Sequence, residues 1–401
     1  MQAAPPQTSP TASVRRRVAA VVAVSAGSVA FILLWGLDRN FFDLKIYMRA
    51  MRWWADGNPL YDYVQPDRVQ GELYFTYPPL SALLLRPFGA LPLGATIAIF
   101  TVFTVAAIAL TTWWLIKPVA ERRDLPLWYA AGLAIPLALV VEPSRETISF
   151  GQINMVLVVL ILADLLFAVP RNSRWAGVGI GLATALKLFP GIFIVYLIVT
   201  RRWRAAAVSA ATAAGATLLA AAVFPRDSWR FWTVELWSTE RVGRLDYTGN
   251  QSLQGMIARL VAPDQPPKLV WLLVAVAVAA FGLWRAARAA REGDNVAALT
   301  LTGLVGALIS PITWPHHVYW FIPALIVLID AGGRRNYWLF GITLAVMIFG
   351  VNTFIDWGEG ADPTHDPGTF LLRNLYVLLM LVLLVWLPAR HLPERAPNGQ
   401  T

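Results

Sequence analysis

Long apolar runs separated by short polar segments make up most of this 401-residue chain. Many of the runs approach the roughly 20 residues that an α-helix needs to cross a bilayer, and we count about 12 of them. The first covers residues 18–36 and follows three arginines, Arg15 to Arg17. Because no small-residue cleavage site follows this run, we interpret it as an uncleaved span instead of a signal peptide. The pattern predicts an all-α polytopic membrane protein.

Two stretches depart from simple crossings. Pro87 and Pro92 interrupt residues 78–116, which favours a short or re-entrant piece there. Residues 175–200 hold two apolar runs of about a dozen residues, each short for a full crossing. The residues between them, Lys187 to Pro190, predict a hairpin of half-helices, a backbone that is tolerated at membrane depth only where it lines a polar cavity.

Arginine clusters between the apolar runs predict the topology. The positive-inside rule assigns them to the cytoplasm, together with a disordered tail (residues 1–13) and a C-terminal tail (residues 391–401). One transmembrane domain, 14–390, is expected between the tails. Tryptophans in residues 225–266 suggest a helix that lies in the membrane interface. The polar loops expected on the outside are 37–77, 225–266, 310–317 and 352–367.

Composition supports this class. The chain is 57% hydrophobic and 14% charged, and its formal net charge is +9. Basic residues on such a chain more often set topology and touch anionic lipid than bind nucleic acid, so no nucleic-acid partner is expected. The sequence has no cysteine, which excludes disulfides, thiol catalysis and cysteine-ligated metals.

Asp43 is the first candidate for chemistry. An acid close to an apolar span is costly unless it is used, and this one opens a loop rich in tryptophan and tyrosine. A helix N-cap is the structural alternative, because a carboxylate in that position satisfies free backbone N–H groups. The pattern alone does not separate the two.

Lys187 is the second candidate. A lone lysine inside an apolar stretch must either extend its amine to water or meet an anion, and a phosphate beside a break in a helix is a natural partner. Gln152 and Asn154 follow a cluster of charges and suit sugar hydroxyls, with interhelical hydrogen bonding as the alternative.

The remaining candidates lie in other predicted outer segments. His316 and His317 adjoin near two prolines, where donation to a phosphate or sugar is favoured over metal binding because no nearby acid completes a site. No metal and no cofactor are expected. The other residues predicted at the site are Tyr77, Arg145, Asn250 and Gln251.

Six short motifs occur in one order along residues 15–390. Together they resemble the actinobacterial polyprenol-phosphate-mannose-dependent α-(1→2)-mannosyltransferases of glycosyltransferase family 87, above all the mycobacterial enzymes that act on phosphatidylinositol mannosides and lipomannan. Pro315 departs from the commonest form, so both histidines are kept as candidates. The motifs are Asp43–Tyr47, Phe75–Pro79, Phe150–Asn154, Lys187–Pro190, Asn250–Ser252 and Ser310–His317.

The resemblance implies a C-type glycosyltransferase fold in the plasma membrane, with its active site on the periplasmic side. It implies a polyprenol-phosphate mannose donor, a lipid-anchored mannoside acceptor and a catalytic role for Asp43. Displacement of the lipid phosphate needs a base for the acceptor hydroxyl and cations for the leaving group. We assign the first role to Asp43 and the second to Lys187 with His316 or His317, and Arg145 as a further candidate.

Two other functions stay open from the sequence. Related transferases move arabinofuranose from decaprenyl-phosphate arabinose, although the Gln152 and histidine motifs favour mannose. A transporter or lipid flippase would show repeated halves and charges deep in several spans. The polar residues here gather at one predicted face, which favours an enzyme.

Overall fold

The structure is a computed structural model that describes residues 10–36, 39–67, 71–238, 241–350 and 364–390. Helices dominate these residues, as the hydrophobic pattern predicted. Four helices are long and apolar enough to cross a membrane, or six if each of two bent helix pairs is one span. The chain is therefore a multi-pass membrane protein, while the count of about 12 segments stays a prediction.

The N-terminal half combines long helices with short ones. Two antiparallel strands pair Val64 with Tyr74 at one end of the hairpin and Asp67 with Gly71 at the other. The elements are α1 (Pro10–Trp35), α2 (Phe42–Ala55), the 3-10 turn η1 (Leu60–Asp62), β1 (Val64–Asp67), β2 (Gly71–Tyr74), α3 (Pro79–Gly89), α4 (Leu93–Arg122), α5 (Leu127–Val140), α6 (Glu142–Phe150), α7 (Asn154–Ala163), the π-helical turn η2 (Asp164–Ala168), α8 (Val178–Leu186) and α9 (Gly191–Val199).

The C-terminal half is helical throughout its described part. Its elements are α10 (Trp203–Val223), α11 (Pro225–Thr233), η3 (Glu235–Trp237), α12 (Leu253–Val261), α13 (Lys268–Arg291), α14 (Asn295–Ile309), η5 (Pro315–His317), α15 (Phe321–Ala331), α16 (Arg334–Phe349), α17 (Pro367–Arg373) and α18 (Leu375–Trp386).

The structure can be compared with only part of the predicted tails and of the predicted loop 352–367. Helix α1 begins at Pro10, so it includes the last residues of the segment expected to be a tail. Residues 1–9, 391–401 and most of the expected loop 352–367 lie outside the described residues.

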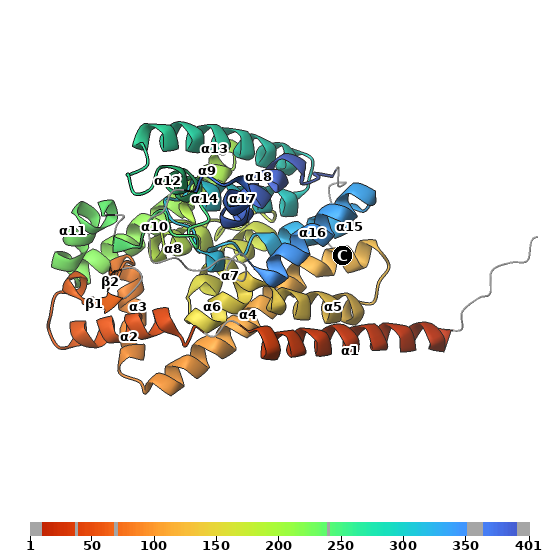
Figure 1. Cartoon of the computed structure of the whole chain (residues 1–401), viewed down its shortest axis with the longest axis horizontal. Helices are drawn as coiled ribbons and strands as arrows, with labels where there is room; N and C mark the ends of the chain where they lie inside the picture. Colours follow the sequence, from red (N-terminus) through yellow and green to blue (C-terminus); the bar gives the residue numbers. More distant parts are fainter. Residues whose placement is uncertain (1–9, 37–38, 68–70, 239–240, 351–363, 391–401) are drawn as a thin grey trace, which may run out of the picture.

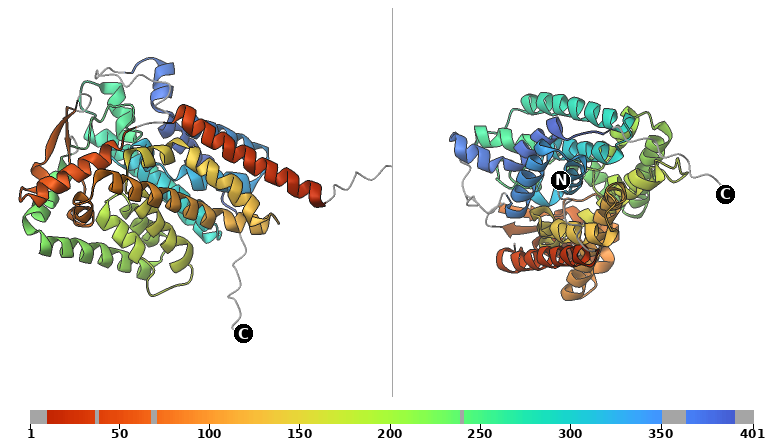
Figure 2. Two further views of the ribbon diagram at one scale, coloured as in Figure 1. Left: turned by 90° about the horizontal axis from the view of Figure 1, so that it is seen from below. Right: turned by 90° about the vertical axis from the view of Figure 1, so that its right-hand side faces the viewer.

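The helices lie mainly along one long axis. In Figure 1, α1 runs along the lower edge and α13 along the upper edge, while α2, the β-hairpin and α11 gather at the left end. Figure 2 shows α1 beside α5, against which it packs. Helix α2 and the β-hairpin of the first half thus meet α11, which follows α10, at one end of the molecule.

Both interrupted stretches contain the short helices that the sequence predicted. Helix α3 ends at Gly89, and Pro92 is the N-cap of the long helix α4. Residues 175–200 form the nine-residue helices α8 and α9, with Lys187 in an extended conformation after the first of them.

Opposite ends of α14 and α15 carry different chemistry. At the Asn295 end of α14, Asp294 and Asp330 form ion pairs with Arg390, and Arg122 also pairs with Asp330. At the other end of these helices lies the loop with the two histidines. With 15 residues, α14 separates the two ends by about 22 Å. These ion pairs and the histidine loop therefore lie at opposite ends of α14, while the predicted sidedness of the membrane protein stays a prediction.

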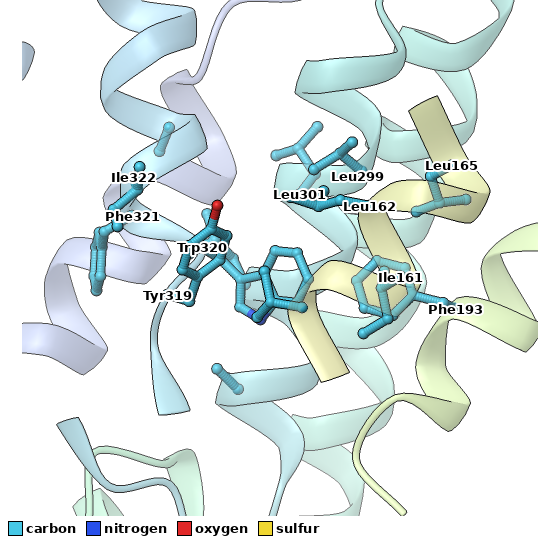
Figure 3. Close-up of a cluster of buried hydrophobic side chains, with 14 of the residues drawn as sticks. Ile161, Leu162, Leu165, Phe193, Leu299, Leu301, Tyr319, Trp320, Phe321 and Ile322 are labelled. Carbon is cyan, nitrogen blue, oxygen red and sulfur yellow. The ribbon is translucent and has the colours of Figure 1, made fainter. Parts of the chain in front are cut away.

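Two apolar clusters support the polar end. The larger one fills the bundle and includes Trp320 and Phe193, which Figure 3 shows as sticks. Their ring centroids lie 5.0 Å apart. The smaller cluster buries one face of α2, where Leu44, Met48 and Met51 recur at helical spacing. Helix α2 is therefore held by its apolar face while its first turn faces the bundle.

Candidate active site

A pocket of about 290 Å³ lies where the chain segments between helices meet α2. These segments are residues 73–78, the turn between α6 and α7, the break between α8 and α9, and the loop between α14 and α15. Breaks in helices leave backbone groups and polar side chains free to face a cavity. Seven of the predicted site residues line the pocket: Asp43, Tyr77, Gln152, Asn154, Lys187, His316 and His317.

Asp43 faces this pocket from the first turn of α2. The N-cap residue is Phe41, and no side-chain cap hydrogen bond forms there. Oδ2 of Asp43 instead accepts a hydrogen bond from Nε2 of Gln152. The capping interpretation is therefore wrong. Burial raises the pKa of the Asp43 carboxyl, an effect that His316 and the Gln152 hydrogen bond oppose.

Gly151 brings the α6–α7 turn up to α2. It ends α6 with φ of 71°, a conformation that favours glycine. A Cβ atom at this position would lie 2.6 Å from Cβ of Leu44, which is too close for any side chain. The glycine of the Phe150–Asn154 motif thus allows Gln152 to reach Asp43.

Two tyrosines fix the orientation of the Gln152 amide. The Tyr77 hydroxyl donates to Oε1 of Gln152 at 2.8 Å, and Nε2 of Gln152 also donates to the Tyr47 hydroxyl at 3.1 Å. The two hydroxyls lie 2.8 Å apart. Since the Tyr77 proton is already used, Tyr47 is the donor in this pair. The amide therefore presents N–H, not oxygen, to Asp43.

Replacement of Gln152 by Ala is expected to reduce kcat about 10- to 100-fold with little change in KM, because a misplaced base costs rate more than binding. Loss of the N–H donor also raises the pKa of Asp43, so the acid limb of the pH–rate profile moves to higher pH. Gln254→Ala in α12 is the matched control, and it leaves the profile in place. An unchanged acid limb in Gln152→Ala would contradict the assigned role.

Lys187 lines the same pocket as Asp43 and lies in the extended segment after α8. Its Nζ lies 3.1 Å from Oδ1 of Asn154, 2.9 Å from Nε2 of His317 and 3.4 Å from the Tyr77 hydroxyl. Nδ2 of Asn154 donates to the His316 carbonyl at 3.0 Å, which turns Oδ1 towards the lysine. Burial lowers the pKa of Lys187, and the Asp43 charge opposes this shift.

The two histidines have different surroundings, and both line the pocket. His316 is 5% exposed, and neither ring nitrogen has a hydrogen-bond partner within the described ranges; Oε2 of Glu146 lies 3.8 Å from Nδ1. Buried polar atoms without partners are costly, so a site that supplies a partner gains binding energy. His317 is held by the backbone N–H of Trp314, which donates to Nδ1 at 3.2 Å.

Asn250 and Gln251 do not line the pocket, although the sequence predicted them there. Asn250 Oδ1 accepts from the Thr313 N–H at 3.0 Å, and its Nδ2 donates to the Pro311 carbonyl at 3.2 Å. Nε2 of Gln251 donates to the carbonyl of Arg373 at 2.7 Å. Both amides therefore fasten neighbouring segments, and Asn250 holds the histidine loop.

Asn250→Ala is expected to lower the free energy of unfolding by about 2 kcal/mol, because buried partners of Asn250 lose their hydrogen bonds. The loosened loop should also weaken donor binding. Thermal melting of the purified protein and the donor KM measure the two effects. Asn336→Ala, in α16, is the control that changes stability without changing KM, and an equal KM in both variants would refute a link to the loop.

Arg145 also lies away from the pocket. Its guanidinium donates to the carbonyls of Trp35 at 2.9 Å and of Ile348 at 2.6 Å, at the ends of α1 and α16. These groups belong to helix ends that lack partners of their own. The residue joins two helices, and the structure does not bring it to the other predicted cations.

One wall of the pocket was missed by the sequence reasoning. Arg241 lies 3.9 Å above the Tyr74 ring and forms an ion pair of 2.7 Å with Glu235, and all three line the pocket. No spacing signal links a β-strand to a loop this far along the chain. Tyr47 was also missed as a site residue, but its position four residues after Asp43 places both on one helix face.

No group of three or more His, Asp or Glu residues in the described part of the chain is placed to hold a metal ion. The site instead sets the Asp43 carboxylate against one amine and two imidazoles at the end of a membrane bundle, and the Glu235–Arg241 ion pair forms a separate wall. Such a site suits displacement of an anionic group from a lipid-linked substrate. The fold and site thus define a multi-pass membrane enzyme of the group-transfer class.

The chain belongs to glycosyltransferase family 87, whose model matches residues 75–311. It is 36% identical to a polyprenol-phosphate-mannose-dependent alpha-(1-2)-phosphatidylinositol mannoside mannosyltransferase of Mycobacterium tuberculosis, over 78% of this chain and 75% of the relative. The corresponding pentamannoside mannosyltransferase of Mycolicibacterium smegmatis is 31% identical over 81% of this chain and 78% of its own.

A more distant relative is an alpha-(1->3)-arabinofuranosyltransferase of Mycobacterium tuberculosis, 30% identical over 63% of this chain and 56% of the relative. No solved structure is significantly similar to the chain.

Proposed function

We propose that the protein transfers mannose from polyprenol-phosphate mannose to a mannosylated phosphatidylinositol and forms an α-1,2 linkage. The names of the mannosyltransferase relatives support the donor and the linkage. The observation that carries the proposal is the pocket in which Asp43 faces Lys187, His316 and His317. Asp43 matches the base that the reaction needs, and Lys187 with the two histidines supplies N–H groups that can stabilise the leaving phosphate.

The reaction is a single displacement. The acceptor hydroxyl gives its proton to Asp43 while its oxygen bonds to the anomeric carbon of mannose. The bond between that carbon and the phosphate oxygen breaks, and its electron pair leaves with the lipid phosphate. Lys187 and the histidines stabilise the charge that develops on the phosphate. A β-linked donor then yields an α-linked product by inversion.

We further propose a C-type bundle of about 12 segments in the plasma membrane, with the pocket on the periplasmic side. Arg122 and Arg390 lie at the ends of α14 and α15 that are far from the pocket, and they support this orientation by the positive-inside rule. Trp229 in α11 and Trp237 in η3, 74% and 73% exposed, are suited to the membrane interface. A lipid-anchored acceptor and the polyprenol donor would both reach the pocket there.

The proposal predicts a bell-shaped dependence of kcat/KM on pH. Asp43 must be ionised, and because its pKa is raised, the rate falls as pH drops through a value above that of an ordinary aspartate. Lys187 must be charged, and because its pKa is lowered, the rate falls as pH rises through a value below that of an ordinary lysine. Initial rates over a pH series test both limbs, and a flat profile would contradict the assignment.

A donor comparison tests the function itself. Membranes that contain the protein are supplied with polyprenol-phosphate mannose or with decaprenyl-phosphate arabinose, each with a phosphatidylinositol mannoside acceptor. Transfer of mannose and not arabinose is expected. Transfer of arabinose alone would contradict the proposed donor. Decaprenyl-phosphate arabinose is the second candidate donor because the chain is also similar to an arabinofuranosyltransferase.

A further inference from the structure

The hydrogen bonds around Lys187 determine which side-chain nitrogen atoms in the pocket carry protons before a substrate binds. A backbone N–H is always a donor, so the Trp314 N–H requires an unprotonated Nδ1 on His317. A neutral imidazole with a free Nδ1 carries its proton on Nε2. The Nε2–H of His317 therefore points at Nζ of Lys187, 2.9 Å away.

Nζ must then accept a hydrogen bond, and only a neutral amine has a lone pair for this. A neutral amine also has two N–H groups, and two acceptors face it. Oδ1 of Asn154 is one, because the other end of that amide donates to a carbonyl. The Tyr77 hydroxyl is the second, because its own proton goes to Gln152. One acceptor role and two donor roles account for the three hydrogen-bond contacts of Nζ with described residues, and the ring of Tyr77 also lies 4.9 Å from it.

A charged ammonium does not fit the same contacts. It would aim a third N–H at Nε2 of His317, which already carries a proton. The histidine could accept only by moving that proton to Nδ1, against the Trp314 N–H. The titratable groups that line the pocket with the lysine are Asp43, Tyr47, Tyr74, Tyr77, Glu235, Arg241, His316, His317 and Tyr319. Among them, the charge of Asp43 raises the pKa of Lys187 and so favours its charged form.

We infer that Lys187 is a neutral amine in the empty pocket and that binding of the anionic donor phosphate is coupled to uptake of one proton by this amine. The Lys187 nitrogen and the Nε2–H of His317, which face each other before the phosphate binds, both turn to the phosphate oxygens. The balance is one amine and one proton from the buffer giving one ammonium and the deprotonated buffer, with no bond to the substrate made or broken. The inference rests on the proposed function for the identity of the anion.

Calorimetry of the full-length protein measures this uptake. The probe is a citronellyl ester of mannosyl methylphosphonate, in which a methylene replaces the bridging oxygen so that the sugar cannot transfer. Binding heats are recorded at mildly alkaline pH in three buffers that differ in ionisation enthalpy. The slope is expected to correspond to about one proton per site in the wild type.

Lys187→Arg is the matched variant, because a guanidinium stays charged at every working pH. Its slope is expected to fall to near zero while binding persists. A wild-type slope near zero, or an equal slope in Lys187→Arg, would overturn the inference.

A second measurement does not depend on the donor. The empty protein is acylated with acetic anhydride over a pH series, and the reactivity of each lysine is followed by mass spectrometry. Lys187 is expected to react as a free amine at a pH well below the ordinary range of a lysine side chain. If Lys187 reacts only in that ordinary range, the inference fails. Early titration of Lys187 without binding of the phosphonate would instead refute the proposed donor alone.

Discussion

Asp43→Asn is expected to lower kcat at least 1,000-fold, because a positioned general base contributes about 10²- to 10⁴-fold to such a reaction. An amide removes the base with almost no change of shape. Its oxygen can still accept the hydrogen bond from Gln152, so the helix and the pocket should keep their structure. Mannosyl transfer by purified wild type and variant, at equal protein levels, measures the effect.

The matched control is Asp56→Asn, at the C-terminal end of the same helix and exposed. It is expected to keep the wild-type rate. If Asp43→Asn retained a tenth or more of the wild-type rate with an unchanged melting curve, Asp43 would not be the base, and the mechanism proposed here would be wrong.

Lys187→Met is expected to produce the second-largest loss, about 100- to 1,000-fold in kcat/KM, because removal of one preorganised group that stabilises developing charge costs this much. Methionine keeps the length of the side chain and removes the charge. Lys187→Arg should recover part of the rate, since the positive charge returns with a different geometry. Its alkaline limb should disappear from the pH profile, because arginine does not lose its proton.

Lys268→Met, at an exposed lysine of α13, is the control for general effects of a lost charge. It should leave the rate unchanged. Equal activity of Lys187→Met and wild type would exclude a role for this amine in leaving-group stabilisation.

The sequence predicted the helical membrane class and the broken helices because these depend on local signals. Apolar runs, Pro92 and the Lys187–Pro190 break each act on their own segment. The pocket residues were predicted as separate candidates, but their contacts depend on tertiary structure. Gly151 illustrates the limit: the sequence shows a glycine, whereas the reason for it is the approach of Leu44 from another helix.

The errors of the prediction have a similar physical cause. Asn250, Gln251 and Arg145 are polar residues near the expected outer face, and polarity alone does not tell a ligand-binding group from one that satisfies a helix end or a loop carbonyl. Each of them has a backbone partner more than 50 residues away in sequence. The pocket wall formed by Arg241, Tyr74 and Glu235 was also missed, because the contact between Arg241 and Tyr74 joins segments that are distant in sequence.

The most direct test of the central claim is the anomeric outcome of transfer by the purified protein. Wild-type protein in lipid discs is given β-linked polyprenol-phosphate mannose and a phosphatidylinositol mannoside, and the new glycosidic bond is assigned by nuclear magnetic resonance. We expect an α-1,2-linked mannose in the wild-type product and no product with Asp43→Asn. A β-linked product, or transfer that proceeds equally without the Asp43 carboxylate, would contradict single displacement in this pocket.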